Sequence, residues 1–286
     1  MSAPLQSLGE MQVIGVQDGA GYMYPDIYAG AGHGGDGGDG GEAGDDAVHA
    51  GMGDEVDELG RTVIPISAFV VRTGGVTAII DAGIGERSVE WTPPGVGTQK
   101  LEGGALPGAL AAAGVAREEI DLVLLTHVHL DHNGWVWADD APFFPNATVR
   151  CGAGDWALVA GQSGEGAAMM QALADAGRVE LIEGDIDVAP GISTLHTPGH
   201  TPGHTMYVLS SGERRAMILG DAISCPLQIA LPELEAAADV DKELGIATRQ
   251  RVLRELEGSD TLVGGPHFPG LEFGRVLTGN AKRYFS

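Results

Sequence analysis

Four short motifs rich in histidine and aspartate each follow a stretch that predicts a β-strand. They are THVHLDH at residues 126–132, TPGHTPGH at 197–204, GD at 220–221 and GGPHFPG at 264–270. The apolar runs ahead of them, at 122–125, 192–195, 216–219 and 261–263, predict the strands. Because strand ends hold side chains more firmly than mobile loops do, the four motifs are expected to converge on one point.

The residue types and their spacing predict two metal sites that share one ligand. Imidazole nitrogens and carboxylate oxygens suit zinc, with iron, manganese and cobalt as alternatives. His127 and His129 point the same way in an extended segment, and Asp131 and His132 follow once the chain turns. The predicted ligand sets are His127, His129 and His200 for one divalent ion, Asp131, His132 and His267 for the other, and Asp221 as the bridge.

Such a pair of ions predicts hydrolytic chemistry. Two divalent cations outweigh the charge of two carboxylates and a bridging hydroxide, so a net positive charge remains to polarise a carbonyl or phosphoryl oxygen. The bridging hydroxide is the expected nucleophile. Asp131, beside it, is the expected catalytic group that moves the proton.

Residues close to the motifs are expected to have supporting roles. His196 and His204 flank a predicted ligand without fitting the ligand pattern, so we expect them to support the ligands from outside. Trp135 and Trp137 follow the first motif. They are interpreted equally well as the lining of an apolar pocket or as core residues.

The composition narrows the class of partner. The chain of 286 residues carries 40 acidic and 16 basic side chains, a net charge of −24, which repels phosphate backbones and anionic membranes. We therefore expect a small-molecule substrate and neither nucleic acid nor a membrane as partner, and a homodimer stays open. The sequence has no apolar run of about 18 residues, no secretory signal pattern and only two cysteines, which favours a cytoplasmic protein.

The ordered part of the chain predicts one domain of two packed sheets with outer helices. Further strands are expected at residues 12–16, 66–72, 76–80 and 206–209, and helices at 105–113, 165–176 and 241–257. The last helix is expected to have Leu244, Ala247, Leu253 and Leu256 on its apolar face. Residues 17–30 and 85–104 are predicted as Gly/Pro loops. A Gly/Asp-rich, low-complexity insertion is predicted at about 30–60, because this composition buries too little apolar surface to offset its ordering entropy.

The motif residues, in this order, resemble the metallo-β-lactamase-fold superfamily over roughly residues 62–280. The HxHxDH motif of that family is matched at residues 127–132, and its later His, Asp and His are matched by His200, Asp221 and His267. Asp81 matches an early aspartate that supports the ligands from outside. The resemblance implies an α/β fold over residues 1–286, an αββα sandwich of two mixed sheets with outer helices and the metals at one edge.

Finer features resemble the branch that holds methyl parathion hydrolases and lactonase-like hydrolases. They are PFFPNA at 142–147, HFPG at 267–270, and the motif GD followed by PLQ at 226–228. Acyl-homoserine lactonases of this fold often carry a tyrosine a few residues after the bridging aspartate, where it assists the substrate carbonyl. This chain has Ser224 and Cys225 there, so Tyr22, Tyr24 or Tyr28 would have to supply a phenol instead.

The expected function is therefore a binuclear metal-dependent hydrolase of small neutral esters or lactones, working through a metal-bridging hydroxide. A phosphotriester hydrolase and a thioesterase of the glyoxalase II kind would use the same centre. A mononuclear iron sulfur-dioxygenase shares HxHxDH and is the alternative from another class. A metal-binding scaffold without catalysis is the non-enzymatic alternative, which the presence of all seven expected ligands disfavours.

Overall fold

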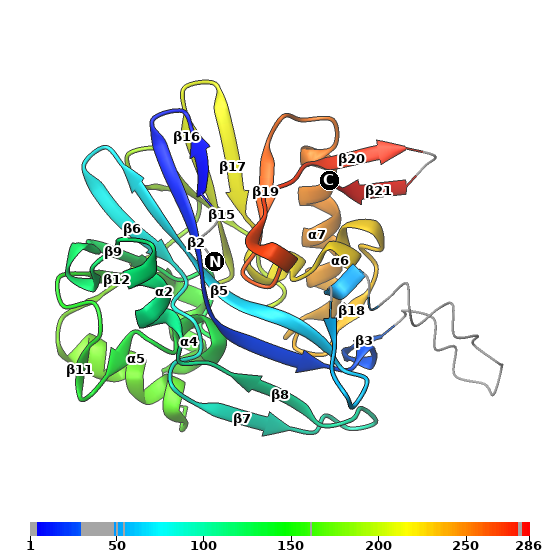
Figure 1. Ribbon diagram of the computed structural model, residues 1–286, viewed down its shortest axis with the longest axis horizontal. Helices are drawn as coiled ribbons and strands as arrows, with labels where there is room; N and C mark the ends of the chain where they lie inside the picture. Colours follow the sequence, from blue (N-terminus) through cyan, green and yellow to red (C-terminus); the bar gives the residue numbers. More distant parts are fainter. Residues whose placement is uncertain (1–4, 30–48, 50, 54, 161, 280–281) are drawn as a thin grey trace.

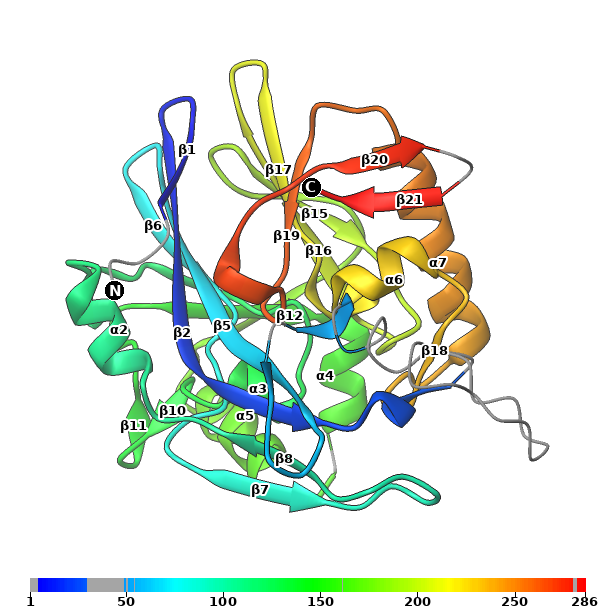
Figure 2. The ribbon, with the colours of Figure 1, turned by 45° about the vertical axis from the view of Figure 1, so that its right-hand side comes forward.

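Two large sheets face one another, and helices cover their outer faces (Figures 1 and 2). The computed structural model describes residues 5–29, 49, 51–53, 55–160, 162–279 and 282–286. The αββα sandwich expected from the sequence is confirmed, and both sheets are mixed, with parallel and antiparallel pairs.

The first sheet has ten strands among the described residues, eight of them in the order β13-β12-β9-β6-β5-β2-β8-β7, while β1 pairs with β2 and β4 with β5. The neighbours β6, β9, β12 and β13 run parallel to one another. In chain order the strands are β1 (Leu5–Leu8), β2 (Met11–Met23), β4 (Glu55–Val56), β5 (Thr62–Thr73), β6 (Val76–Ile80), β7 (Ser88–Trp91), β8 (Gln99–Glu102), β9 (Leu122–Leu124), β12 (Thr148–Gly152) and β13 (Val179–Ile182).

The second sheet has five strands among the described residues, in the order β14-β15-β16-β17-β19. They are β14 (Asp187–Ala189), β15 (Ile192–His196), β16 (Thr205–Ser211), β17 (Arg214–Ile218) and β19 (Leu262–Gly264). In the described part of the chain, small two-stranded sheets are formed by β3 (Tyr28–Ala29) with β18 (Glu235–Ala236), β10 (Trp137–Ala138) with β11 (Ala141–Pro142), and β20 (Val276–Gly279) with β21 (Lys282–Phe285).

Helices cover the outer face of each sheet. Residues of α2 and α5 pack on the first sheet, and residues of α7 pack on the second, so the two groups lie on opposite sides of the molecule (Figure 1). The α-helices among the described residues are α2 (Leu106–Ala112), α3 (Leu130–Asn133), α4 (Ala153–Val159), α5 (Glu165–Asp175), α6 (Pro226–Ala230) and α7 (Lys242–Leu256). Short 3-10 helices are η1 (Pro25–Ile27), η2 (Arg117–Glu119), η3 (Gly220–Ile223) and η4 (Pro269–Leu271).

The alternation of side chains along the strands explains the layered core. Successive residues of a strand point to opposite faces of its sheet. In β5, Phe69 and Val71 therefore pack between the two sheets, whereas Ala68 and Val70 pack outward with Leu106 of α2. Because both faces are covered, this central strand is buried without interruption from Ile66 to Val71.

Two segments that the sequence predicts as loops contain strands. Strand β2 runs on to Met23, so Tyr22 lies within it rather than in a loop. Residues 88–102, inside the loop predicted at 85–104, form a hairpin of β7 and β8 that pairs with β2. Its strands are short and bounded by glycine and proline, so their local pattern is weak, and pairing with a distant strand decides their conformation.

Helix α7 begins where the sequence predicts, but its first turns bury a different face. Asp241 caps the helix by accepting a hydrogen bond from the backbone N–H of Leu244 (3.0 Å). Leu244 and Ala247, expected on the apolar face, are exposed, whereas Leu253 and Leu256 are buried as expected. The reason is that the backbone at Gly199 approaches the helix closely at Gly245, so the face with Gly245 turns inward. A Cβ on Gly199 would lie only 2.3 Å from the backbone nitrogen of Gly245.

The insertion predicted at about residues 30–60 falls only partly on described residues, since 30–48, 50 and 54 lie outside them. The described residues that follow pack against β5. Nδ1 of His49 lies 2.6 Å from Oγ1 of Thr62, Met52 is buried, and β4 pairs with β5. The insertion at about residues 30–60 stays a prediction, of which the structure describes only these last residues. Among the helices of the described residues, none is long and apolar enough to cross a membrane.

Candidate metal centre

The first predicted ligand set converges from both sheets. His127 and His129 follow β9 of the first sheet, and His200 follows β15 of the second. Nδ1 of His129 lies 3.0 Å from Nε2 of His127 and 3.0 Å from Nε2 of His200. Three ring nitrogens thus face one point, in a group that could hold a metal ion.

The second predicted set lies beside the first and again joins the two sheets. Asp131 and His132 belong to α3, which follows β9, and His267 follows β19. Nε2 of His267 lies 3.2 Å from Nε2 of His132 and 3.5 Å from Oδ2 of Asp131. These three side chains form another group of suitable geometry for a metal ion.

Asp221 lies between the two sets. Its Oδ1 is 3.3 Å from Nε2 of His267 and 3.5 Å from Nε2 of His132, and its Oδ2 is 3.6 Å from Nε2 of His200. Oδ1 is buried and has no hydrogen-bond partner among the described residues. A buried carboxylate oxygen without a donor is costly, and a cation at this point would satisfy it.

The protonation states also fit a divalent cation. Burial first, and neighbouring imidazoles second, lower the pKa of His127 well below its usual value and the pKa of His129 to about 4. Both rings are therefore neutral at pH 7, with lone pairs available to a metal. Burial opposes the charge on Asp221, but the imidazoles of His267 and His132 lower its pKa well below the usual value. Burial opposes protonation of His132 and His267, but Asp221 raises the pKa of both rings, so a bound cation would displace their protons. The donor set thus combines the neutral rings of His127 and His129 with an ionised carboxylate, which suits zinc and related ions.

Two ligand candidates of the first sheet are oriented through Asp81 and Thr126. Nδ1 of His132 donates to Oδ2 of Asp81 (3.0 Å), and the backbone N–H and hydroxyl of Thr126 donate to the same carboxylate. The hydroxyl of Thr126 in turn accepts from Nδ1 of His127 (3.1 Å). Both rings therefore carry their proton on Nδ1 and turn Nε2 toward the centre.

The two ligand candidates that follow strands of the second sheet are oriented in the same way, by partners that the sequence did not predict. Nδ1 of His200 donates to Oδ1 of Asp239 (2.9 Å), and Nδ1 of His267 donates to the carbonyl of Pro65 (2.7 Å). Neither partner lies in a metal motif. An isolated Asp after an alanine run and a carbonyl on a strand give no sequence signal.

His204 supports the bridge and is not positioned as a ligand. Its Nε2 accepts hydrogen bonds from the backbone N–H groups of Asp221 (3.0 Å) and Ala222 (3.2 Å). Its Nδ1 donates to the hydroxyl of Thr197 (2.8 Å). This is the outer position expected for it. His196, in contrast, is exposed, and its Nε2 donates to the carbonyl of Pro202 (3.1 Å), away from the predicted ligands.

A cavity of about 330 Å³ opens on the predicted ligands. Its apolar walls come from β2, β5, α3 and the β7–β8 hairpin, and its described lining contains neither Lys nor Arg. The lining residues are Met23, Ile27, Tyr28, Ile64, Val89, Trp91, Leu101, His129, Leu130, Asp131, His200, Asp221, Ser224, Ala236, Ala238 and His267.

Of the tyrosines considered from the sequence, Tyr28 lines this cavity, with its hydroxyl 2.7 Å from Oγ of Ser224. Tyr22 instead donates to Glu102 (2.6 Å). Trp135 is a core residue, packed in the layer under α2 and α5, and its indole N–H donates to Asp18 (2.8 Å). Trp137 packs against the same layer, so the core interpretation of both tryptophans is correct.

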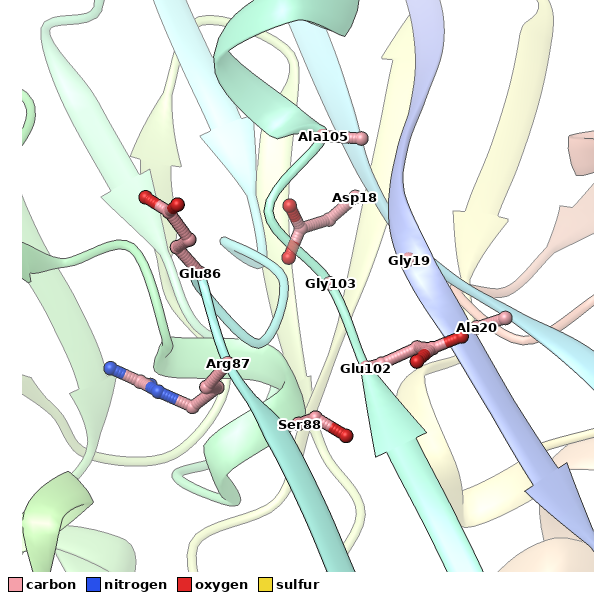
Figure 3. Close-up of a pocket in the computed structure, with 9 residues that line it drawn as sticks. All are labelled: Asp18, Gly19, Ala20, Glu86, Arg87, Ser88, Glu102, Gly103 and Ala105. Carbon is pink, nitrogen blue, oxygen red and sulfur yellow. The ribbon is translucent and has the colours of Figure 1, made fainter.

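A wider, open hollow of about 570 Å³ beside β8 carries no histidine in its described lining (Figure 3). Asp18 projects toward it, but the carboxylate of Asp18 is occupied by backbone N–H groups. Ile84 and Leu106 each donate to it at 2.8 Å. This carboxylate therefore joins β2 to the segments around it. The described lining of the hollow contains no group of side chains suited to a metal ion like those of the metal centre.

The fold and this site define the class of protein. The model of the metallo-beta-lactamase superfamily matches residues 61–255, more than half of the chain. The chain therefore belongs to the metallo-beta-lactamase superfamily, and with this constellation of side chains it is a metal-dependent hydrolase.

Solved structures share the fold over nearly the whole chain. Hydrolase AbOPH of the beta lactamase superfamily is 24% identical, with a TM-score of 0.77 over 100% of this chain and 97% of that one. AidC, a dizinc quorum-quenching lactonase, is 19% identical, with a TM-score of 0.79 over 100% and 97%. A probable metal-dependent hydrolase from Staphylococcus aureus is 19% identical, with a TM-score of 0.69 over 92% and 91%.

Proposed function

We propose that the protein hydrolyses small neutral esters or lactones with the help of two divalent metal ions, zinc in the first place. The observation that carries this proposal is the cavity, which is mostly apolar, has no cationic side chain in its described lining, and ends on the predicted ligands. A neutral substrate can enter it without an unpaired charge, whereas an anionic phosphomonoester would find no counter-charge in its walls.

The seven residues predicted from the sequence are proposed as the ligands. One ion would be held by Nε2 of His127, Nδ1 of His129 and Nε2 of His200, the other by Asp131, His132 and His267, with Asp221 shared. Two ions bound there would activate a water molecule and polarise a substrate carbonyl. The orphan oxygen of Asp221 and the Nδ1 anchors of the four Nε2-facing rings support this assignment.

Asp131 is proposed as the group that holds and moves the proton. Its carboxylate lines the cavity and is 15% exposed, so it reaches both the predicted ligands and a bound substrate. From this position it can take the proton of the attacking water and return it to the alkoxide that leaves.

Tyr28 is proposed as the hydrogen-bond donor to the substrate oxygen. Oε1 of Gln228 accepts from the backbone N–H of Ser224 (2.8 Å) and from its hydroxyl (3.1 Å). Since the Ser224 proton is directed at Gln228, Ser224 Oγ accepts from Tyr28 in the free enzyme. Rotation of the phenol O–H would redirect its proton into the cavity, where it could stabilise an oxyanion.

A substrate panel tests this function on metal-replete protein. An aryl ester, an aliphatic lactone, a thioester and paraoxon are compared by kcat/KM. We expect the ester or the lactone to be the best substrate, with weaker activity on paraoxon. A phosphotriester preferred by more than about tenfold, about 1.4 kcal/mol in transition-state binding, would instead establish the phosphotriesterase alternative. Tight binding of a single iron, with oxygen consumption on a persulfide, would move the protein to the dioxygenase class.

A further inference from the structure

Arg249 of α7 is fully buried, which is rare for an arginine. Its side chain has no exposed surface and is among the largest fully buried side chains of the described residues. Burying a guanidinium costs free energy unless its N–H groups are satisfied and its charge is balanced. Its partners therefore indicate what its presence achieves.

Three of these partners are backbone carbonyls from segments that adjoin the metal centre. Nε donates to the carbonyl of Ala222 (2.9 Å), and Nη1 donates to the carbonyls of Pro232 (2.9 Å) and Leu234 (2.7 Å). Ala222 directly follows Asp221, the proposed bridging ligand. One end of the guanidinium therefore holds the turn that carries the bridge.

The other end holds the partner of a second ligand. Nη2 of Arg249 lies 3.5 Å from Oδ2 of Asp239, and Oδ1 of Asp239 accepts from Nδ1 of His200 (2.9 Å). The backbone N–H of Val240 also donates to the carbonyl of His200 (3.0 Å). Asp239 thus contacts His200 through its own side chain, and the next residue, Val240, contacts His200 through its backbone.

We propose that Arg249 is a positioning residue that couples the two ligands His200 and Asp221 through one guanidinium. By donating to Asp239 it orients that carboxylate, and the carboxylate in turn accepts the hydrogen bond of His200 Nδ1 and orients the ring. By holding the carbonyl of Ala222 it fixes the turn of η3. This inference rests on the proposed ligand roles of His200 and Asp221.

The number and placement of these hydrogen-bond partners explain why an arginine suits the positioning of His200 and Asp221. The planar guanidinium offers five N–H donors in a fixed fork, so it can bind three carbonyls and a carboxylate at once. The two loops come from different strands, β15 and β17, and α7 lies against both. A lysine or an apolar residue could fill the volume but could not make these contacts together.

Metal affinity tests the proposal without reference to any substrate. The variants Arg249→Met and Asp239→Asn are titrated with zinc against a chelator, and their cobalt(II) spectra are recorded. Arg150→Met is the matched control, because Arg150 also joins a carboxylate (Glu180) to a carbonyl (Val188) but lies away from the centre. We expect affinity for at least one ion to fall about 10- to 100-fold in the first two variants, as for other outer partners of ligands, and to stay unchanged in the control.

The outcomes separate this inference from the proposed function. If the parent protein binds no divalent metal, the proposed function fails, and this inference fails with it. If the parent binds metal but folded Arg249→Met has the same affinity and the same cobalt spectrum, Arg249 only supports the fold and the inference is overturned. If Arg249→Met does not fold, Asp239→Asn decides, since it leaves the three carbonyl contacts in place. Unchanged affinity in Asp239→Asn would then contradict the coupling to His200.

Discussion

At the scale of single residues, the centre brings together side chains whose ring nitrogens and carboxylate oxygens repel one another or lack a partner when no cation is bound. Nδ1 of His129 lies 3.0 Å from a ring nitrogen of His127 and 3.0 Å from one of His200, and one oxygen of Asp221 has no donor among the described residues. Such a cluster stores an unfavourable electrostatic energy that metal binding would relieve. The free energy of metal binding is therefore expected to depend most on the residue that both sets share.

The substitution Asp221→Ala should remove that shared oxygen pair. We expect it to lower the metal content below two ions per chain and to abolish hydrolysis, because the histidine set loses its only anionic ligand and the two ions lose the ligand they share. Elemental analysis and kcat/KM on the best substrate measure both effects. A variant that kept full metal content and activity would show that Asp221 is not the bridge.

Tyr28→Phe should leave the metals in place and impair the chemistry. Losing one donor to an oxyanion costs about 10²- to 10³-fold in strong cases, and we expect roughly tenfold or more in kcat here. Tyr22→Phe is the matched control, because its hydroxyl bonds to Glu102 outside the cavity. Equal kinetics in the two variants would eliminate Tyr28 as the donor.

At the scale of elements, the β7–β8 hairpin forms one side of the substrate cavity. It pairs with β2 through β8 and contributes Val89, Trp91 and Leu101 to the lining. It occupies a segment that has the composition of a loop. The pocket is therefore shaped by an element whose position depends on the long strand beside it.

The hairpin provides a prediction about substrate preference. Trp91→Ala should raise KM for substrates with a large apolar group about tenfold or more, since burying an aromatic side chain is worth roughly 1.5–3 kcal/mol. Substrates with a small group should be affected less. Leu59→Ala serves as the control, because Leu59 is 65% exposed and does not line the cavity. A uniform change for all substrates would instead point to damage of the hairpin itself.

At the scale of the whole molecule, each proposed ligand set joins the two sheets. The set of His127, His129 and His200 takes ligands that follow β9 and β15, and the set with His267 takes ligands that follow β9 and β19. Bound ions would therefore hold the sandwich together at this edge. The net charge of −24 adds a long-range preference for cations and neutral molecules over anions.

Metal removal should accordingly destabilise the protein. Elemental analysis of gently purified protein is expected to give about two ions per chain, most of it zinc. Chelation should lower Tm by roughly 10 °C, because a ligand at about 1,000 times its Kd contributes roughly 4 kcal/mol and each kcal/mol moves Tm by about 2–4 °C at this size. Restoring zinc should restore Tm. An unchanged Tm after complete removal would show that the ions do not couple the sheets.

The sequence by itself determined the proposed donor atoms and most of the framework that carries them. The spacing of His127, His129, Asp131 and His132 is local, so adjacent side chains needed only a strand and a turn to face two points. The buried strands and helices that the pattern predicts are found, because each depends on the periodicity of its own residues. The order of the motifs along the chain was then enough for a resemblance to the superfamily.

Only the tertiary structure decided what surrounds those ligands. Tyr28 meets Ser224 across 196 positions and His267 meets Pro65 across 202, while Arg249 reaches Ala222, Pro232 and Leu234 through their backbone carbonyls. A carbonyl is present at every residue, and a lone Tyr, Asp or Arg has no periodic context. Their roles arise from which segments the packing of two sheets brings together, and that information is not carried by any local stretch of the chain.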